Sequence, residues 1–206
     1  MQEQDIYGKY GAYLPKILED LSQRIQEAND RVKQETGQKL FEHFNARVKQ
    51  AASMEEKCQR KNLPRVPESA LKEIRDAIGI RIVCGFIEDI YQTIEVLRQL
   101  EGCEIVLEKD YIRAAKPNGY RSYHLILEVE TPYEDCHGQN PGRYFVEIQL
   151  RTIAMDSWAS LEHQMKYKRE IKDSKRIVRE LKRCADELAS CDVTMQTIRN
   201  LIRESE

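Results

Sequence analysis

The sequence predicts an α+β fold, in which a mixed β-sheet is packed with α-helices and flanked by N- and C-terminal helices. Apolar residues recur at three- and four-residue steps near both ends of the chain, over residues 14–25 and 177–202, as they do in amphipathic helices. Between these ends, four segments alternate apolar and polar residues with the period of two that is typical of strands. A helical segment separates the first strand from the other three, so we expect a mixed sheet with helices on it.

Length and composition limit the architecture and the compartment. The 206 residues suffice for one catalytic-sized domain with appended helices, and 33 Lys and Arg nearly balance 35 Asp and Glu, so local basic clusters matter more than net charge. Six cysteines without a C-x-x-C pair fit neither a zinc site nor a disulfide framework. With no apolar run of about 20 residues and no leader-like start, we expect a soluble cytoplasmic protein without membrane contact.

The first half of the chain reads as three helical pieces, a strand and another helix. The N-terminal helix should end near Gly37. A second helix over residues 53–61 should stop before the two prolines of LPRVP, which mark a turn into a short helix from Glu68. Residues 78–84 are expected to form a central strand whose second face is open enough for Arg81. Helical spacing then returns, with Gly102 as the C-terminal stop.

The second half contributes three strands and two helices. The strands are expected over residues 103–112, 121–129 and 144–151, with Pro-, Gly- and Asn-containing loops between them. A helix then carries Ala154, Trp158, Leu161 and Met165. The C-terminal apolar residues follow a heptad seam. Packing against the N-terminal helix and self-association explain this seam equally well.

Strand alternation defines a candidate ligand face on the last strand. Val146, Ile148 and Leu150 should face the core, and the opposite face carries Phe145, Glu147, Gln149 and Arg151. An acid, an amide and a guanidinium in one row suit a charged, polar ligand. This row is a candidate active-site floor.

The strand over 121–129 and the loop before it add residues suited to a nucleotide. Tyr123 and the alternate residues after it should point inward, which leaves Ser122 and His124 on the opposite face. An isolated histidine in this place is more often structural. Upstream, Lys116 and a glycine that permits close backbone approach precede Tyr120, whose ring can stack on a base.

Two acids from separate elements are candidate magnesium ligands. Asp76 comes immediately before the strand that carries Arg81, where a turn residue with a surface ion pair explains it about as well as a functional role. With Glu147, however, Asp76 can hold Mg²⁺, which favours one or two carboxylates together with phosphate oxygens and water.

A basic patch precedes the sheet, formed by Arg47, Lys49, Lys57, Arg60 and Lys61. The last three share one helical face. Such a patch can bind a triphosphate or RNA, although most lysines and arginines on helices contact only water. Cys136 and His137 are two isolated potential metal ligands without the partner ligands that a metal site needs. Neither a P-loop nor a Rossmann glycine pattern is present.

Three long motifs resemble the synthetase domain of the RelA/SpoT family. They are DAIGIRIVCGF, EKDYIRAAKPNGYRSYHL and VEIQLRTIAMDSWASLEH, in this order, within roughly residues 40–168. The short chain with flanking helices is similar to the small alarmone synthetases of that family. Long members carry a separate HD hydrolase domain, and no His-Asp dipeptide occurs here, so hydrolysis is not expected.

The resemblance implies a nucleotidyltransferase-like domain that moves the β,γ-pyrophosphoryl group of ATP to the 3′-hydroxyl of GDP or GTP. The products are AMP and ppGpp or pppGpp, the alarmones of the stringent response. By resemblance Asp76 binds Mg²⁺, and Glu147 activates the 3′-hydroxyl and assists with the metal. The donor-side residues matching the family are Arg47 and Arg81, which sandwich adenine, and Lys49, Lys57 and Arg60, which surround the ATP phosphates.

On the acceptor side, Tyr120 matches the tyrosine that stacks on guanine. The other residues placed near the acceptor are Lys109, Lys116, His124, Gln149, Arg151 and Asp156. The family often has Ala in the position of Ile78 and Asn in the position of Asp156. Neither difference touches the two acids.

Domain limits and partners complete the expectation. We divide the chain into an N-terminal helix (1–37), the synthetase domain (38–168) and a helical extension for oligomerisation (169–206). The resemblance implies a homotetramer, with (p)ppGpp or single-stranded RNA as possible regulators, and leaves the choice among GDP, GTP and GMP open. Two alternatives remain: a toxin-like pyrophosphokinase acting on tRNA 3′ ends or adenosine nucleotides, and a regulatory RNA-binding protein, against which the two intact acids argue.

Overall fold

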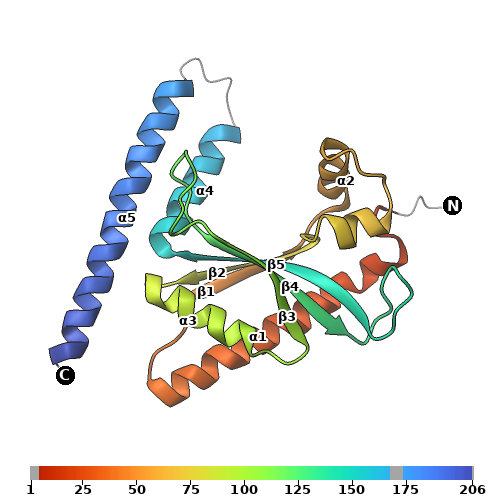
Figure 1. Ribbon diagram of the computed structural model, residues 1–206, viewed down its shortest axis with the longest axis horizontal. Coiled ribbons are helices and arrows are strands. Elements are labelled where there is room, and N and C mark those ends of the chain that lie inside the picture. Colours follow the sequence, from red (N-terminus) through yellow and green to blue (C-terminus); the bar gives the residue numbers. More distant parts are fainter. Residues whose placement is uncertain (1–4, 168–173, 206) are drawn as a thin grey trace.

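Five strands form one mixed sheet in the order β1-β2-β5-β4-β3 in the computed structural model, which describes residues 5–167 and 174–205 (Figure 1). The strands are β1 (His43–Val48), β2 (Ile78–Cys84), β3 (Cys103–Asp110), β4 (Tyr123–Thr131) and β5 (Gly142–Thr152). Strands β2 and β5 are parallel, and the other neighbours are antiparallel. The α+β prediction is confirmed. Strand β2 is interior as expected, but β5 occupies the middle.

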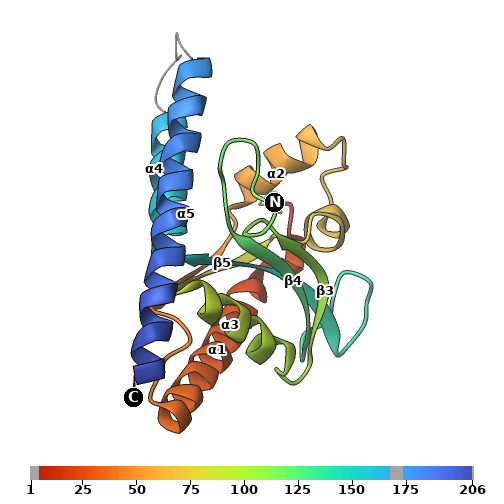
Figure 2. The same ribbon diagram turned by 60° about the vertical axis from the view of Figure 1, so that its left-hand side comes forward.

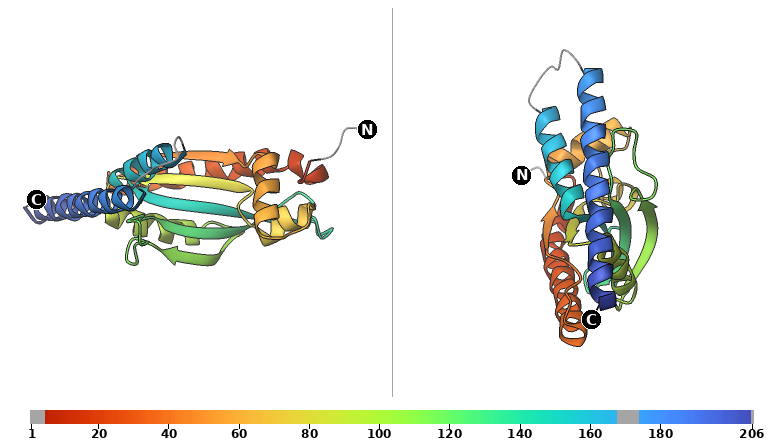
Figure 3. Two further views of the ribbon diagram at one scale, coloured as in Figure 1. Left: turned by 90° about the horizontal axis from the view of Figure 1, so that it is seen from above. Right: turned by 90° about the vertical axis from the view of Figure 1, so that its left-hand side faces the viewer.

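Helices cover one face of the sheet and stand at both ends of the other. They are η1 (Gly8–Ala12), α1 (Leu14–Thr36), α2 (Ala51–Arg60), the π-turn η2 (Ser69–Glu73), α3 (Ile87–Arg98), α4 (Ile153–Tyr167) and α5 (Ser174–Ser205). Helices α1 and α3 lie beneath the sheet in Figure 1. Seen from above, α4 and α5 gather at one end of the molecule and α2 at the other (Figure 3). The part of the sheet between α2 and α4 is left for a site.

The core lies between the sheet and helices α1 and α3. Ile78, Ile80 and Ile82 of β2 are at most 2% exposed and belong to one apolar cluster with the stripe of α1. The inward residues of β4 and β5 join the same cluster. Because side chains alternate across a strand, burying this set directs the polar set to the opposite face. The two-face assignment made from the sequence is confirmed.

Strand β1 was missed by the sequence analysis, which placed a basic patch there before the sheet. It is an edge strand of six residues, and none of its residues is fully buried. Apolar periodicity arises from burial, so a strand of this kind gives little signal. Gly102 was also misplaced as a helix stop: α3 ends at Arg98, and Gly102, at φ +66°, forms the turn into β3. Helix α1 ends just before Gly37, as predicted, and Gly37 has the left-handed conformation at φ +73°.

Helix α5 packs on α4 and α3, with which it has its main contacts (Figure 2). The interpretation that its seam packs against the N-terminal helix is wrong, because the apolar stripe of α1 is already buried against the sheet. Trp158 of α4 donates a hydrogen bond to the Leu181 carbonyl at 2.9 Å. Further along, Met195, Ile198 and Ile202 are 46–56% exposed, so residues 5–167 and 174–205 leave part of the seam uncovered.

Two expectations involve residues that the structure does not describe. The predicted limit between residues 168 and 169 lies outside the described ranges. The first four residues of the predicted N-terminal unit do so as well. Among the helices that are described, none combines the length and apolarity needed to cross a membrane.

Candidate active site

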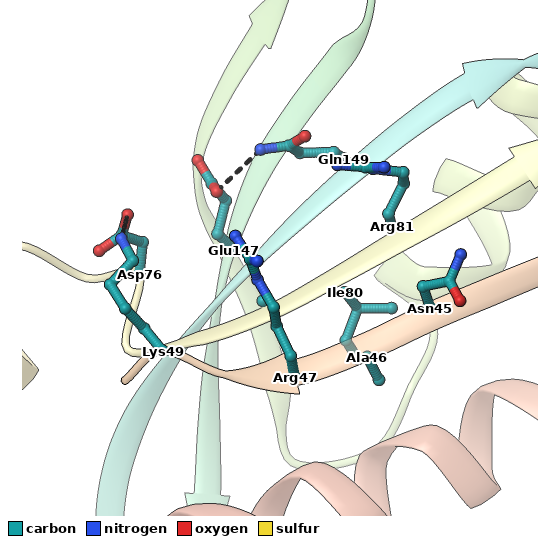
Figure 4. A pocket seen from close by; sticks show the side chains of 10 residues that line it. Asn45, Ala46, Arg47, Lys49, Asp76, Ile80, Arg81, Glu147 and Gln149 are labelled. Atoms are coloured by element: carbon teal, nitrogen blue, oxygen red, sulfur yellow. Dashed lines mark hydrogen bonds and ion pairs between the residues drawn. The ribbon is translucent and has the colours of Figure 1, made fainter. Parts of the chain in front are cut away.

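A hollow of about 410 Å³ lies on the polar face of the sheet, over β1, β2 and β5 (Figure 4). Its lining residues are Asn45, Ala46, Arg47, Lys49, Asp76, Gly79, Ile80, Arg81, Glu147 and Gln149. Strand register explains the opening, since Gly79 pairs with Arg47 on one side and Glu147 on the other. A Cβ at Gly79 would meet nothing within 4 Å. The missing side chain therefore leaves space between a guanidinium and a carboxylate.

Asp76 sits at one end of the hollow, between two lysines. Its Oδ2 atom accepts hydrogen bonds from the Nζ atoms of Lys49 and Lys57, which come from the end of β1 and from α2. The Asp76 side chain is only 11% exposed, and its Oδ1 atom is buried with no hydrogen-bond partner in the part of the chain that the structure describes. Burial lowers the pKa of Lys49, and the nearby Asp76 carboxylate opposes this effect. The unused oxygen is available for a cation.

Glu147 lies on β5 and receives one polar neighbour at each carboxylate oxygen. Gln149 donates from Nε2 to Oε2 at 3.0 Å, and His124 Nδ1 is 3.7 Å from Oε1. Burial would raise the pKa of Glu147, but His124, Gln149 and the charge of Lys57 outweigh it and lower the pKa to about 2. Glu147 is therefore an ionised carboxylate at neutral pH.

Tyr120 and Arg151 extend the polar face beyond the hollow. The Tyr120 hydroxyl is 2.7 Å from His124 Nε2 and accepts a hydrogen bond from Arg151 Nη2 at 2.9 Å. Lys116 Nζ lies 4.7 Å from the Tyr120 ring centre and 4.5 Å from that of Tyr111. The loop lysine and the strand residues thus meet around one aromatic ring.

Asp156, at the start of α4, joins the two sides of the site. One of its oxygens, Oδ1, lies 3.4 Å from Arg81 Nη1 and 2.9 Å from Arg151 Nη1. Arg81 lines the hollow, whereas Arg151 belongs to the Tyr120 group. A single carboxylate therefore links the candidate donor and acceptor arginines.

The remaining predicted residues lie further out. Lys109 is exposed on β3, opposite His124 in the strand register. Arg60 is exposed at the end of α2 and, like Lys61, is not part of the lining of the hollow. The structure therefore gathers most of the expected site residues on one face and leaves these three at its margin.

Residues 46–172 match the family model described as the region found in RelA/SpoT proteins, which is more than half of the chain. This chain belongs to the RelA/SpoT family. Over 151 residues it is 44% identical to the GTP pyrophosphokinase YwaC of Bacillus subtilis, covering 73% of this chain and 70% of that protein. The GTP pyrophosphokinase YjbM of the same organism is 32% identical, covering 93% and 87%.

Solved structures give the same result over nearly the whole chain. The small alarmone synthetase 1 of Bacillus subtilis bound to its product pppGpp aligns with a TM-score of 0.79 at 31% identity, covering 92% of this chain and 94% of that one. The small alarmone synthetase 2 of Bacillus subtilis aligns with a TM-score of 0.78 at 37% identity, covering 92% and 95%. The flanking helices of this RelA/SpoT family member are therefore part of a shared architecture.

The acids of this RelA/SpoT chain fit a hard cation that is completed by its ligand. Among residues 5–167 and 174–205, no group of three or more His, Cys, Asp or Glu side chains forms a ready-made metal site. Magnesium commonly uses one or two protein carboxylates and takes its other ligands from phosphates and water. The partnerless Asp76 oxygen and the ionised Glu147 suit that mode. His137, by contrast, is 3.2 Å from the Glu68 carboxylate in a separate loop pair.

Sequence reasoning missed Asn45, Gly79 and Tyr111 as members of the site. Asn45 was missed because β1 was missed, and Gly79 because a glycine within a strand gives no direct sign of the space above it. Tyr111 lies 5.4 Å from the His124 ring. It follows β3 directly and belongs to one of the three quoted motifs, so that motif was the available signal.

Proposed function

We propose that this chain is a GTP pyrophosphokinase that makes (p)ppGpp by moving the β,γ-pyrophosphoryl group of ATP to the 3′-hydroxyl of GDP or GTP. The observation that carries the proposal is the hollow itself, where Asp76 and Glu147 are set among Arg47, Lys49 and Arg81. This arrangement occurs in a chain that is similar to two GTP pyrophosphokinases over at least 70% of their lengths. Two acids surrounded by cations suit phosphoryl chemistry, which depends on positioning and charge neutralisation.

On the donor side, Arg47 and Arg81 are proposed to hold adenine between their guanidiniums. Both line the hollow, from strands β1 and β2, and the open space over Gly79 is next to Arg47. Planar guanidiniums stack on aromatic rings. Lys49 and Lys57, which contact Asp76 in the free protein, would then contact the ATP phosphates. Arg60 would lie at the outer end of this row of positive charges.

On the acceptor side, guanine is proposed to stack on Tyr120, and the 5′-phosphates to meet Lys109, Lys116 and His124. In support, Lys116 already lies against the Tyr120 ring. Lys109 and His124 are paired across β3 and β4. Gln149 lies between this group and the hollow. Arg151, which is buried, stands behind these residues and bonds Asp156, whose side chain is 20% exposed.

Glu147 is proposed as the general base. The 3′-oxygen forms a bond to the β-phosphorus while the bond from that phosphorus to the α–β bridging oxygen breaks, which releases AMP. Glu147 accepts the hydroxyl proton, and its lowered pKa keeps the carboxylate ionised until that step. Mg²⁺, held by Asp76 and Glu147, would supply neutralisation of the phosphate charge.

The compartment and assembly follow from the same proposal. A cytoplasmic location agrees with nucleotide substrates and with six cysteines that are all free thiols. We propose that the exposed apolar residues of α5 mediate self-association into a homotetramer. Regulation by (p)ppGpp or single-stranded RNA also remains a proposal.

The test uses ATP labelled at the γ-phosphate with Mg²⁺ and, in separate reactions, GDP, GTP, GMP, deacylated tRNA or ATP alone. Wild-type protein should label GDP or GTP, and Glu147→Gln should lose about 10²–10⁴-fold in rate while still binding both nucleotides. Glu130→Gln is the matched control, because Glu130 is 50% exposed on β4 and pairs with Arg143. Label on tRNA or adenosine, no transfer at all, or an active Glu147→Gln would overturn the assignment.

A further inference from the structure

Five side chains of the site form a closed ring of polar contacts. Glu147 meets Gln149 at 3.0 Å, and Gln149 Oε1 meets Arg151 at 2.9 Å. Arg151 meets the Tyr120 hydroxyl at 2.9 Å, which lies 2.7 Å from His124 Nε2. His124 Nδ1 returns to Glu147 at 3.7 Å. Arg151 is therefore connected to the two carboxylate oxygens of Glu147 by two arms, one through Gln149 and the other through Tyr120 and His124.

Arg151 is the most enclosed member of this ring. Its side chain is 5% exposed, whereas those of Glu147 and His124 are 27% and 16% exposed. The Nη2 atom donates to both Tyr120 and Gln149, and Nη1 donates to Asp156 at 2.9 Å. Both Nη atoms are therefore engaged within the ring or with Asp156, and Nε is buried with no hydrogen-bond partner among the described residues.

Because arginine only donates hydrogen bonds, it fixes the orientation of Gln149, and it gives Tyr120 the role of acceptor toward Arg151. A guanidinium only donates hydrogen bonds, so Gln149 must turn its carbonyl oxygen toward Arg151 and its NH₂ group toward Glu147. The Tyr120 oxygen likewise accepts from Arg151, and it lies 2.7 Å from His124 Nε2, to which the Tyr120 hydroxyl can donate its own proton. In that arrangement His124 carries a proton on Nδ1, the nitrogen that faces Glu147 at 3.7 Å. Both neighbours of Glu147 thereby present donors.

We propose that Arg151 is a positioning residue for the transfer reaction, which orients the Gln149 amide and the His124 ring so that both present donors to Glu147. This inference rests on the proposed function, in which Glu147 is the general base. Arg151 acts from behind the site, held by Asp156, instead of binding the acceptor. Without it, the Gln149 amide can turn over and place an oxygen against the carboxylate, and Glu147 loses its fixed orientation.

The kinetic test compares Arg151→Met, which keeps an unbranched chain without donors, with Arg121→Met. Arg121 is a matched control because it bonds Asp186 and the Ala185 carbonyl of α5 and lies outside the ring. Arg151→Met should lower kcat by about 10–100-fold, the cost of a misplaced catalytic group. The KM for GDP and the Kd of a fluorescent GDP analogue should change less than about threefold, by the same argument. Arg121→Met should keep kcat.

Two further measurements separate positioning from ligand binding and from misfolding. In the Gln149→Leu background, Arg151→Met should cost much less than in wild type, because one arm is already lost. In ¹⁵N-labelled wild type, the Gln149 side-chain amide, assigned by its loss in Gln149→Leu, should be shifted and protected from exchange, and Arg151→Met should return it toward free glutamine. If Arg151→Met does not fold, Asp156→Asn serves in its place and should shift the same amide.

The outcomes decide the proposal. A tenfold weaker Kd for the GDP analogue with kcat preserved would make Arg151 an acceptor ligand and overturn it. Unchanged kinetics, fully additive variants, or an unperturbed Gln149 amide would also overturn it. A wild-type protein without transfer activity would refute the proposed function instead, and the amide signal would still report whether Arg151 orients Gln149.

Discussion

Replacing Arg199 with alanine should loosen helix α5 from α3. Arg199 donates from Nη1 to Asp89 at 2.6 Å and from Nη2 to Glu88 at 2.7 Å, and its guanidinium carbon lies 4.2 Å from the Phe86 ring centre. The Arg199 side chain is 13% exposed and that of Asp89 is 9% exposed. This contact at the N-terminus of α3 anchors helix α5, whose outward-facing residues are largely exposed to solvent.

The expected loss is about 3–4 kcal/mol in the free energy of unfolding. Breaking a buried ion pair costs about 3–5 kcal/mol because one charge is left uncompensated. Asp89 keeps a hydrogen bond from the Phe86 amide at 3.1 Å, which favours the lower end. Stacking of the guanidinium on Phe86 adds about 0.5–1 kcal/mol. The Glu88 contact adds little, because that side chain is 44% exposed.

Thermal and urea unfolding measure this loss. For a chain of this size, about 3–4 kcal/mol corresponds to a Tm lowered by roughly 6–15 °C. Arg203→Ala is the control on the same helix. Arg203 contacts Glu88 at 2.9 Å and is 33% exposed, so its loss should stay below about 1 kcal/mol. Because the proposed self-association would also hold α5, both variants are measured at several protein concentrations.

The pH dependence of the stability loss in Arg199→Ala is a second, independent test. Burial raises the pKa of Asp89, and Arg199 opposes this rise, so the pKa should rise further in Arg199→Ala. A carboxyl whose folded pKa is raised destabilises the fold above that pKa and ceases to do so as the pH falls through it. The deficit of the variant should therefore shrink on acidification. Equal small losses for Arg199→Ala and Arg203→Ala, or a deficit that grows at low pH, would refute the reasoning.

Two further predictions concern loops. Burial alone would raise the pKa of Asp135, but bonds from Lys72 and three backbone amides lower it to about 2. Asp135→Asn should therefore lower the free energy of unfolding by about 2 kcal/mol at pH 7. This loss, measured by urea unfolding, should disappear as the pH falls from about 4 to about 2. A loss that is independent of pH would contradict the prediction. Gly119, at φ +91°, directly precedes Tyr120, and in Gly119→Ala the new Cβ would lie 2.6 Å from the Ala185 Cβ. The displaced loop should raise the KM for the acceptor nucleotide about tenfold and leave the KM for ATP unchanged, as measured by initial rates. An unchanged acceptor KM would contradict that prediction.

The sequence by itself determined the two faces of the sheet. The alternation that separates Val146, Ile148 and Leu150 from Glu147 and Gln149 is a property of local strand geometry, and the structure buries the first set fully. The end of the N-terminal helix at Gly37 was equally local. Family membership was also readable from the chain, because three long motifs occur in order. Each of these features depends on residues that are near one another in the sequence.

Only the tertiary structure decided which side chains meet. Lys49, Lys57 and Asp76 come from three elements, and Tyr120 and Arg151 are 31 positions apart. Their contacts depend on strand order and register, which the period of a single strand does not encode. The same reason explains why β1 was missed, because an exposed edge strand has no apolar pattern. It also explains the unexpected partners of α5, because an apolar seam indicates that a helix face is buried and does not indicate which surface buries it.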